Sequence, residues 1–107
     1  QKNHDIAALK LASPLPSDNP NIRAIALLDS SLQDDTECRI SGWGSISSGS
    51  AMPAPLVKAA FVKLISRESC LKTKHGNTVR EDEVCAAGIR KDACMGDEGG
   101  PLVCNDK

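Results

Sequence analysis

The sequence predicts a mainly β domain, and two features of the chain carry this prediction. Short runs with apolar and β-branched residues lie at residues 5–11, 38–44, 56–65 and 101–104. Segments rich in Gly, Pro, Ser, Asn or Asp separate these runs, as is typical of strands joined by turns. The 107 residues suffice for one small core, since a domain of this size hides about 60 to 70% of its unfolded surface.

The cysteine content indicates an oxidising compartment and a disulfide framework. No Cys-x-x-Cys pair occurs and only two histidines are present, so we expect no metal site and no cofactor. The odd number of cysteines predicts that one of them pairs outside this sequence. Trp43 and Phe61 are the only aromatic residues, so aliphatic packing and crosslinks must carry more of the stability. The cysteines are Cys38, Cys70, Cys85, Cys94 and Cys104.

The charge pattern excludes two classes of partner. Thirteen basic and fourteen acidic side chains are dispersed along the chain, and the formal net charge is −1. We therefore expect no nucleic-acid partner and no membrane partner. No apolar run has membrane-spanning length, and residues 1–5 are too polar for a signal peptide. If the protein is secreted, its targeting segment is expected to lie elsewhere.

The first third of the chain predicts little regular structure. Residues 5–11 form an apolar run with β character, which must end before Pro14 and Pro16. Residues 12–36 are rich in Pro, Ser, Asn and Asp around one apolar patch at residues 22–28. This composition predicts a linker with a short strand inside it.

The middle of the chain predicts two strands and a loop. Residues 38–44 indicate a strand that ends in backbone permitted by glycine, and residues 45–55 indicate a Ser/Gly/Pro loop. Residues 56–65 also fit helical spacing, so a helix stays open there. Their β-branched and aromatic content favours a strand.

A short helix and a loop are predicted next. Residues 66–72 indicate a helix, because Ser66 can cap its N-terminus and Glu68 lies in the first turn. Ser69 stands where a capping box requires Glu or Gln, so that box is incomplete. The polar residues 73–83 predict a loop.

The Gly-rich loop at residues 96–100 is the strongest candidate for a functional site. Its three glycines permit backbone torsions that a Cβ forbids, so consecutive N–H groups can form an anion-binding nest. The amides of Gly96 and Glu98 would point into this nest. The alternative interpretation is a tight turn before a short buried strand at residues 101–104.

Three motifs resemble the trypsin-like serine endopeptidases of the chymotrypsin fold. The sequence GDEGGP at residues 96–101 is similar to the family's nucleophile loop, Gly-Asp-Ser-Gly-Gly-Pro. The sequence CRISGWG at residues 38–44 and the sequence DIAALKL at residues 5–11 resemble two further family segments. The chain departs from the pattern at one position, since Glu98 stands where the family has its nucleophilic serine.

The resemblance implies an antiparallel β-barrel of the chymotrypsin type that is incomplete. Residues 1–30 would be the end of the first barrel and the inter-barrel linker. Residues 31–107 would be the second barrel without its last strands. Residues 56–65 would be one of its strands, and residues 83–88, which resemble the family's strand Met-x-Cys-Ala-Gly, would be another. The segment that supplies the family's catalytic histidine has no counterpart in this sequence.

The resemblance also assigns roles to single residues. Asp5 would be the aspartate of the catalytic triad, and Gly96 would donate its amide to the oxyanion hole. Asp92 would lie at the base of the primary specificity pocket and select Arg or Lys. Asp97 would pair with the amino terminus that zymogen cleavage creates.

A disulfide pairing follows from the same resemblance. It implies bridges from Cys38 to Cys104 and from Cys70 to Cys85. Cys94 would lack its partner, because the strand that carries that partner is absent from this sequence.

Glu98 decides between the functional interpretations. A carboxylate is a poor nucleophile toward amides, and it would repel the negative charge that the oxyanion hole stabilises. The first interpretation is therefore an inactive, secreted serine protease homologue that binds a protein or peptide. One alternative is a fragment or one chain of an active secreted trypsin-like protease, in which a complementary chain would carry the first barrel. Another alternative is a non-catalytic disulfide-rich binding protein.

Overall fold

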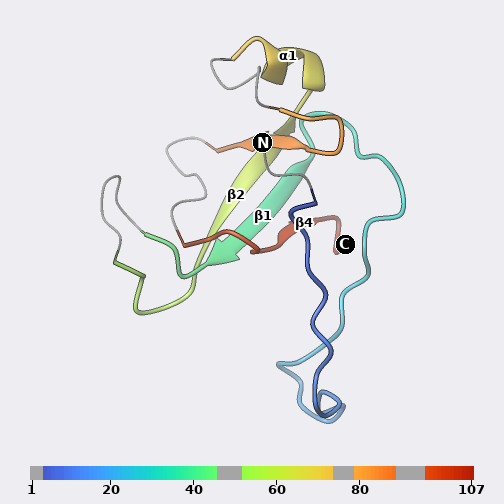
Figure 1. Ribbon diagram of the computed structural model, residues 1–107, viewed down its shortest axis with the longest axis vertical. Helices are drawn as coiled ribbons and strands as arrows, with labels where there is room; N and C mark the ends of the chain where they lie inside the picture. The colour runs from blue at the N-terminus through green and yellow to red at the C-terminus, as the bar shows by residue number, and fades with distance from the viewer. Residues whose placement is uncertain (1–3, 46–51, 74–78, 89–95) are drawn as a thin grey trace.

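A computed structural model describes residues 4–45, 52–73, 79–88 and 96–107 of the chain. This part contains four strands and one short helix (Figure 1). Their bounds are β1 (Glu37–Gly42), β2 (Lys58–Ile65), α1 (Arg67–Leu71), β3 (Cys85–Ala87) and β4 (Leu102–Cys104). The mainly β prediction is confirmed, and each of these elements lies within a segment that the sequence predicted for it or overlaps that segment.

The four strands form one antiparallel sheet in the order β3-β2-β1-β4. β1 is one of the two inner strands, because Cys38 lies opposite Val62 of β2 on one side and opposite Cys104 of β4 on the other. The sheet is not closed in the described residues, as an incomplete barrel of the predicted type requires. β2 is a strand rather than a helix because its cross-strand partners on β1 and β3 satisfy its backbone.

One face of this sheet carries a small core. Alternation along the strands brings every second side chain to the same face, so Cys38, Val62 and Cys104 are buried side by side. Partly buried apolar side chains surround these three residues, and the residues that contribute them are Leu32, Ile40, Leu64, Ala86 and Leu102. The core is thin because β4 and β3 have only three residues each.

A disulfide joins β1 directly to β4 within this core. Cys38 and Cys104 are register partners, and their Cα atoms are 4.3 Å apart. This short separation is typical of an antiparallel pair whose backbone groups point away from one another. The bridge therefore fixes the position of β4, and with it the position of residues 96–101 that lead into β4.

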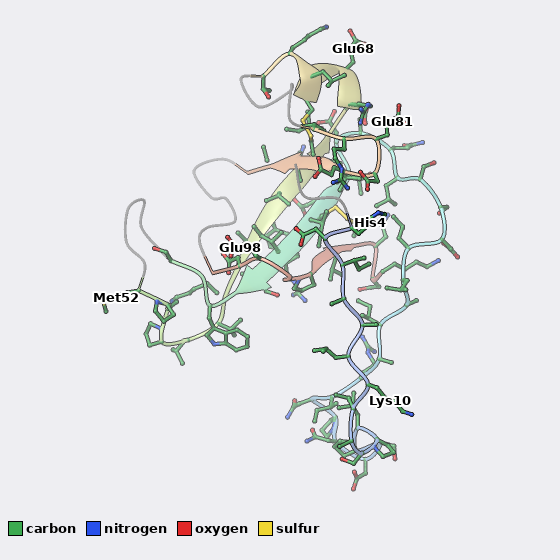
Figure 2. The ribbon with its side chains drawn as sticks, viewed as in Figure 1. His4, Lys10, Met52, Glu68, Glu81 and Glu98 are labelled. Carbon is green, nitrogen blue, oxygen red and sulfur yellow. A yellow bond between two sulfur atoms is a disulfide. The ribbon has the colours of Figure 1, made fainter. Side chains whose placement is uncertain are left out.

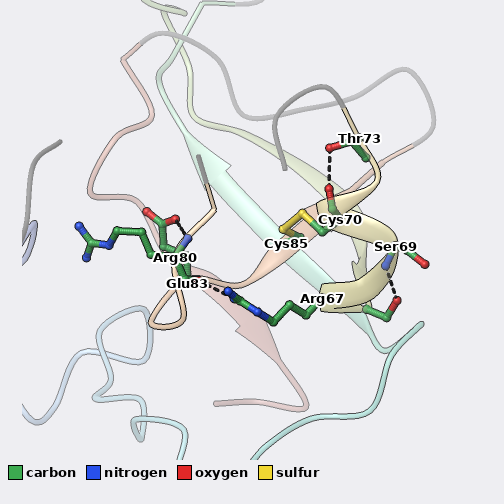
Figure 3. The surroundings of a disulfide bond; sticks show 8 residues. Arg67, Ser69, Cys70, Thr73, Arg80, Glu83 and Cys85 are labelled. Atoms are coloured by element: carbon green, nitrogen blue, oxygen red, sulfur yellow. Dashed lines mark hydrogen bonds between the residues drawn. A yellow bond between two sulfur atoms is a disulfide. The ribbon is translucent and has the colours of Figure 1, made fainter. Parts of the chain in front are cut away.

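The helix α1 lies at one end of the sheet and begins as predicted (Figure 3). Ser66 is its N-cap, and the Ser66 side chain accepts a hydrogen bond of 3.1 Å from the Ser69 amide. Glu68 lies in the first turn, where a carboxylate interacts favourably with the helix dipole. A second disulfide joins Cys70 of α1 to Cys85 of β3 and holds the helix against the sheet.

The prediction of a short strand at residues 22–28 is wrong, and residues 5–11 form no strand either. Residues 4–31 are exposed throughout and form an arm that leaves the sheet and returns to it (Figure 1). An apolar run becomes a strand only where another strand meets its backbone groups. The described residues provide no such partner along this arm.

Two contacts fasten the returning end of the arm. The Lys107 ammonium lies 3.1 Å from a carboxylate oxygen of Asp29, which ties the arm to the chain just after β4. The Asp35 amide donates to the Leu64 carbonyl at 3.0 Å and extends the pairing of β2 beyond β1.

In the described residues, no helix has both the length and the apolar character that crossing a membrane requires.

Candidate functional site in the glycine-rich loop

The candidate site is the loop of residues 96–100, which runs past the end of β1 and leads into β4. Gly96 and Gly99 have φ values of +96° and +82°, a region that side chains with a Cβ rarely adopt. The Gly100 amide donates to the Asp97 carbonyl at 2.9 Å and closes a turn over Glu98 and Gly99. Gly96 and Gly99 therefore adopt backbone torsions of the kind that the sequence analysis expected the glycines to permit.

Asp97 is the residue that joins this loop to β1. The Gly44 amide donates to Asp97 Oδ1 at 2.8 Å, and the carboxylate is half-buried. The same carboxylate fills the space in which a Cβ on Gly42 or Gly44 would lie. We call Gly42 and Gly44 the glycine cradle of Asp97.

The loop also approaches the backbone of β1 closely. A Cβ on Gly100 would lie 2.8 Å from the Asp97 carbonyl oxygen and 3.2 Å from the Ser41 carbonyl oxygen. A Cβ on Gly96 would lie 3.4 Å from the Cα of Gly44. The loop and the end of β1 therefore pack backbone against backbone, and Asp97 supplies the carboxylate between them.

Glu98 is exposed on this loop, and its carboxylate bends back onto the backbone (Figure 2). Its Oε2 atom accepts a hydrogen bond of 2.8 Å from the Gly96 amide. The sequence predicted that the Gly96 amide would stabilise an oxyanion. In the structure this amide already donates its hydrogen bond to the Glu98 carboxylate, which is part of the same loop.

Asp5, the predicted triad aspartate, lies on the exposed arm. Its charge contributes to raising the pKa of Arg80, although the hydrogen bond from Arg80 to Asp82 is the largest cause. The contacts described for residues 96–100 involve the end of β1 and its cradle, and Asp5 is not among them. A triad aspartate would contact a histidine rather than residue 98, so the role of Asp5 stays a prediction.

Arg80 is a structural centre that the sequence analysis missed. Its guanidinium donates to both carboxylate oxygens of Asp82, at 2.9 and 2.5 Å, and its carbonyl accepts from Arg67 at 2.7 Å. The Arg80 amide also donates to Glu83 at 2.7 Å (Figure 3). The side-chain hydrogen bond between Arg80 and Asp82 is the largest cause that raises the pKa of Arg80 and lowers the pKa of Asp82. One basic residue followed by three acidic residues at positions 80–83 was the available signal, but it did not show which groups would meet.

Two of the predicted site residues, Asp92 and Cys94, lie outside the described residues. The two disulfides join Cys38 to Cys104 and Cys70 to Cys85, the pairs that the resemblance implies. No group of three or more His, Cys, Asp or Glu residues that could hold a metal ion occurs among residues 4–45, 52–73, 79–88 and 96–107. The arrangement around residues 96–100 thus offers backbone donors and carboxylates, without a described nucleophile beside a base.

Comparisons with known proteins agree on one family. The sequence matches the family model described as Trypsin over residues 1–107. Trypsin alpha-4 of Lucilia cuprina is 36% identical over 102 residues, which cover 94% of this chain and 39% of that protein. Hypodermin-A of Hypoderma lineatum is 37% identical over 111 residues, which cover 98% of this chain and 41% of that protein.

A solved structure gives the same result for the fold. The chain is similar to neuropsin, a serine protease expressed in the limbic system of mouse brain, with a TM-score of 0.73 and 32% sequence identity. This match covers 80% of the present chain and 39% of the neuropsin chain. The chain therefore spans about two fifths of the length of each of these three proteins.

Proposed function

The chain belongs to the trypsin family of serine proteases, and from this premise we propose that it is a family member that does not cleave peptides and instead binds a protein or peptide. The observation that carries the proposal is the hydrogen bond of 2.8 Å from the Gly96 amide to the Glu98 carboxylate. A nucleophile must attack a carbonyl carbon while an amide of this loop accepts the developing negative charge. Glu98 offers no hydroxyl for that attack, and its own carboxylate accepts the hydrogen bond of the Gly96 amide.

The energetic argument concerns charge. An oxyanion hole works because its donors are preorganised around a charge that develops only in the transition state. With Glu98 in place the donor is already paired, so a substrate would have to displace the carboxylate from it. The displaced carboxylate would still lie beside the forming oxyanion and repel it. Both effects oppose acyl transfer, and loss of a nucleophile alone costs about a million-fold in the well-studied subtilisin case.

A second candidate function is supported by the coverage of the relatives. The chain would be one part of an active trypsin-like protease, and a complementary chain would supply the first barrel and the catalytic histidine. The observation that favours this candidate is the exposed arm, whose large apolar side chains Ile6, Leu9 and Leu27 are each at least 90% exposed. In this assembly Asp5 would act as the triad aspartate and Asp92 would select Arg or Lys.

Extracellular location is part of the proposal. Two disulfides in so short a chain are typical of secreted proteins, because thiols stay reduced in the cytosol. A non-catalytic disulfide-rich binding protein of the same fold would meet the same conditions. Binding measurements therefore matter as much as activity assays.

A two-by-two experiment separates the candidates. The chain and its Glu98→Ser variant are each assayed against Arg and Lys esters, alone and after co-refolding with the parts of trypsin alpha-4 that lie outside the matched region. The proposal expects no turnover from either chain alone, and turnover of the assembly only with Glu98→Ser. Glu98→Gln is the matched control, since it removes the charge without adding a nucleophile.

Each outcome has a definite meaning. Turnover by the co-refolded chain that retains Glu98 would overturn the proposal and favour the active-protease candidate. Co-elution in gel filtration reports whether the assembly has formed. An assembly that forms with Glu98→Ser and still gives no turnover would place the cause of inactivity elsewhere than at Glu98.

A further inference from the structure

Helix α1 depends on one disulfide more than on packing, and the site described above does not use that bridge. Among the five residues of α1, all of them described, only Cys70 is buried, and its sulfur is joined to Cys85 of β3 (Figure 3). Leu71, the one large apolar side chain of α1, is 45% exposed. The contacts of α1 with the strands are few compared with the contacts of the strands with one another. The bridge is therefore the main attachment of the helix to the sheet.

The remaining attachments of α1 lie at the surface. Arg67 donates to the Arg80 carbonyl at 2.7 Å, and this hydrogen bond is exposed. The Lys72 ammonium lies 2.7 Å from a carboxylate oxygen of Glu68, and both side chains are more than 70% exposed. Exposed ion pairs contribute little stability, and a five-residue helix does not form alone. We expect α1 to unfold when its bridge is opened.

The two disulfides differ in how easily a thiol reaches them. Cys38 and Cys104 are 2% and 4% exposed, and they pair in register inside the core beside Val62. Cys85, in contrast, is partly exposed and begins the edge strand β3. Thiol–disulfide exchange requires that a thiolate reach one of the two sulfurs. Exchange should therefore begin at the bridge between Cys70 and Cys85.

We propose that the bridge between Cys70 and Cys85 is a redox-sensitive device, which a low-molecular-weight thiol opens while the bridge between Cys38 and Cys104 stays closed. The thiolate attacks the Sγ atom of Cys85, the bond between the two cysteine sulfurs breaks, and Cys70 leaves as a thiolate. A second thiolate then attacks the small-molecule sulfur of this mixed disulfide and releases the Cys85 thiolate. The bridge gains two electrons, and two small thiols become one small disulfide.

Opening the bridge changes which part of the chain a protease can cleave. Residues 66–72 lose their helical structure, whereas β1, β2 and β4 remain joined by their backbone pairing and by the second disulfide. Cleavage requires a segment that can leave the fold, so Arg67 and Lys72 become cleavage sites only after reduction. The lifetime of the chain among proteases then depends on the surrounding thiols. This inference does not depend on whether the chain itself cleaves peptides.

Stepwise labelling of cysteines tests the order of opening. Thiols of the full chain that are free at the start are first blocked with N-ethylmaleimide. Increasing concentrations of glutathione are then added without denaturant, and new thiols are labelled with iodoacetamide and mapped by mass spectrometry. Cys70 and Cys85 should be labelled at concentrations that leave Cys38 and Cys104 unlabelled. The first glutathione adduct, trapped with acid, should be on Cys85.

Amide exchange measures the unfolding of α1 in the same samples. In the bridged chain the Cys70 amide donates to the Ser66 carbonyl at 2.9 Å. After selective reduction, exchange of this amide should accelerate about tenfold to a hundredfold, because a crosslink across 15 residues restricts the open state by a factor of about that upper size. Exchange of the Val62 amide in β2 should not change. The double variant Cys70→Ala, Cys85→Ala should exchange like the reduced chain without any reductant.

A trypsin digest gives the third measurement. Cleavage after Arg67 and Lys72 should be slow in the bridged chain and fast after selective reduction, whereas cleavage after Arg39 should stay slow in both. Four results would overturn the proposal. These are simultaneous labelling of all four bridged cysteines, a first adduct on Cys70, unchanged exchange of the Cys70 amide after reduction, and faster exchange of the Val62 amide, which would mean that the sheet opens together with α1.

Discussion

At the scale of single residues, Asp97 and the glycine cradle explain how a loop with no apolar side chain of its own holds its position. The carboxylate occupies space that a Cβ at residue 42 or 44 would fill, and Gly44 donates to it at 2.8 Å. Gly44 does not have a positive φ, so the requirement for glycine there is one of space. Asp97 therefore positions the Gly96 and Glu98 backbone by being packed as well as hydrogen-bonded.

Gly44→Ala tests this explanation. We expect a loss of about 1 to 3 kcal/mol in the free energy of unfolding, the usual cost of overpacking a filled site. The measurement is urea denaturation, repeated in an Asp97→Ala background in which the carboxylate is gone. In that background Gly44→Ala should cost far less. Equal costs in the two backgrounds would show that Gly44 is not required for Asp97.

At the scale of elements, α1 illustrates how a five-residue helix persists. A helix of this length is not stable alone, because nucleation costs more than a few hydrogen bonds return. Here a serine cap begins it, the bridge from Cys70 to Cys85 ties it to β3, and Arg67 binds the Arg80 carbonyl at 2.7 Å. The helix is therefore a short segment that its cap, a disulfide and a hydrogen bond hold in place, and it is not stable independently of the sheet.

The cap has a measurable share in this stability. Ser66→Ala should lower the free energy of unfolding by about 0.5 to 2 kcal/mol, because the Ser69 amide loses its acceptor. Ser69→Ala is the matched control, since it removes a hydroxyl from the same helix and leaves the capping bond in place. Thermal denaturation of both variants decides the question. A larger loss from Ser69→Ala than from Ser66→Ala would contradict the capping role.

At the scale of the whole molecule, the arm and the sheet differ in kind. The sheet has two disulfides and a small core, whereas residues 4–31 are exposed and carry several large apolar side chains. Exposed apolar surface of this kind marks sites where another protein surface packs. The contrast suits a chain that spans about two fifths of its relatives.

Limited proteolysis should reveal the contrast directly. A protease that cleaves after Lys and Arg is expected to cut first at Lys10 and Arg23 on the arm, and much later at Arg39 and Lys63 on β1 and β2. Strand residues resist cleavage because their backbone must leave the sheet to enter a protease. Mass spectrometry of the early fragments gives the order. Early cleavage at Arg39 would mean that the sheet is not stable in the isolated chain.

The sequence by itself determined the family, the elements of the sheet and the Gly-rich loop at residues 96–100, because each depends on local signals. The glycines at residues 96–100 predict positive φ, Ser66 predicts a helix start, and the motif around Glu98 resembles the nucleophile loop of the family. These signals are carried by neighbouring residues. The two disulfide pairs join distant cysteines, and only the resemblance to the family implied them.

Only the tertiary structure decided which distant groups meet. It placed Asp97 between Gly42 and Gly44, more than fifty residues away, and gave the Gly96 amide to Glu98. It also left residues 22–28 without a strand, although their composition favours one. A strand is a pairing between segments, so an apolar run has β structure only where the fold supplies a neighbour.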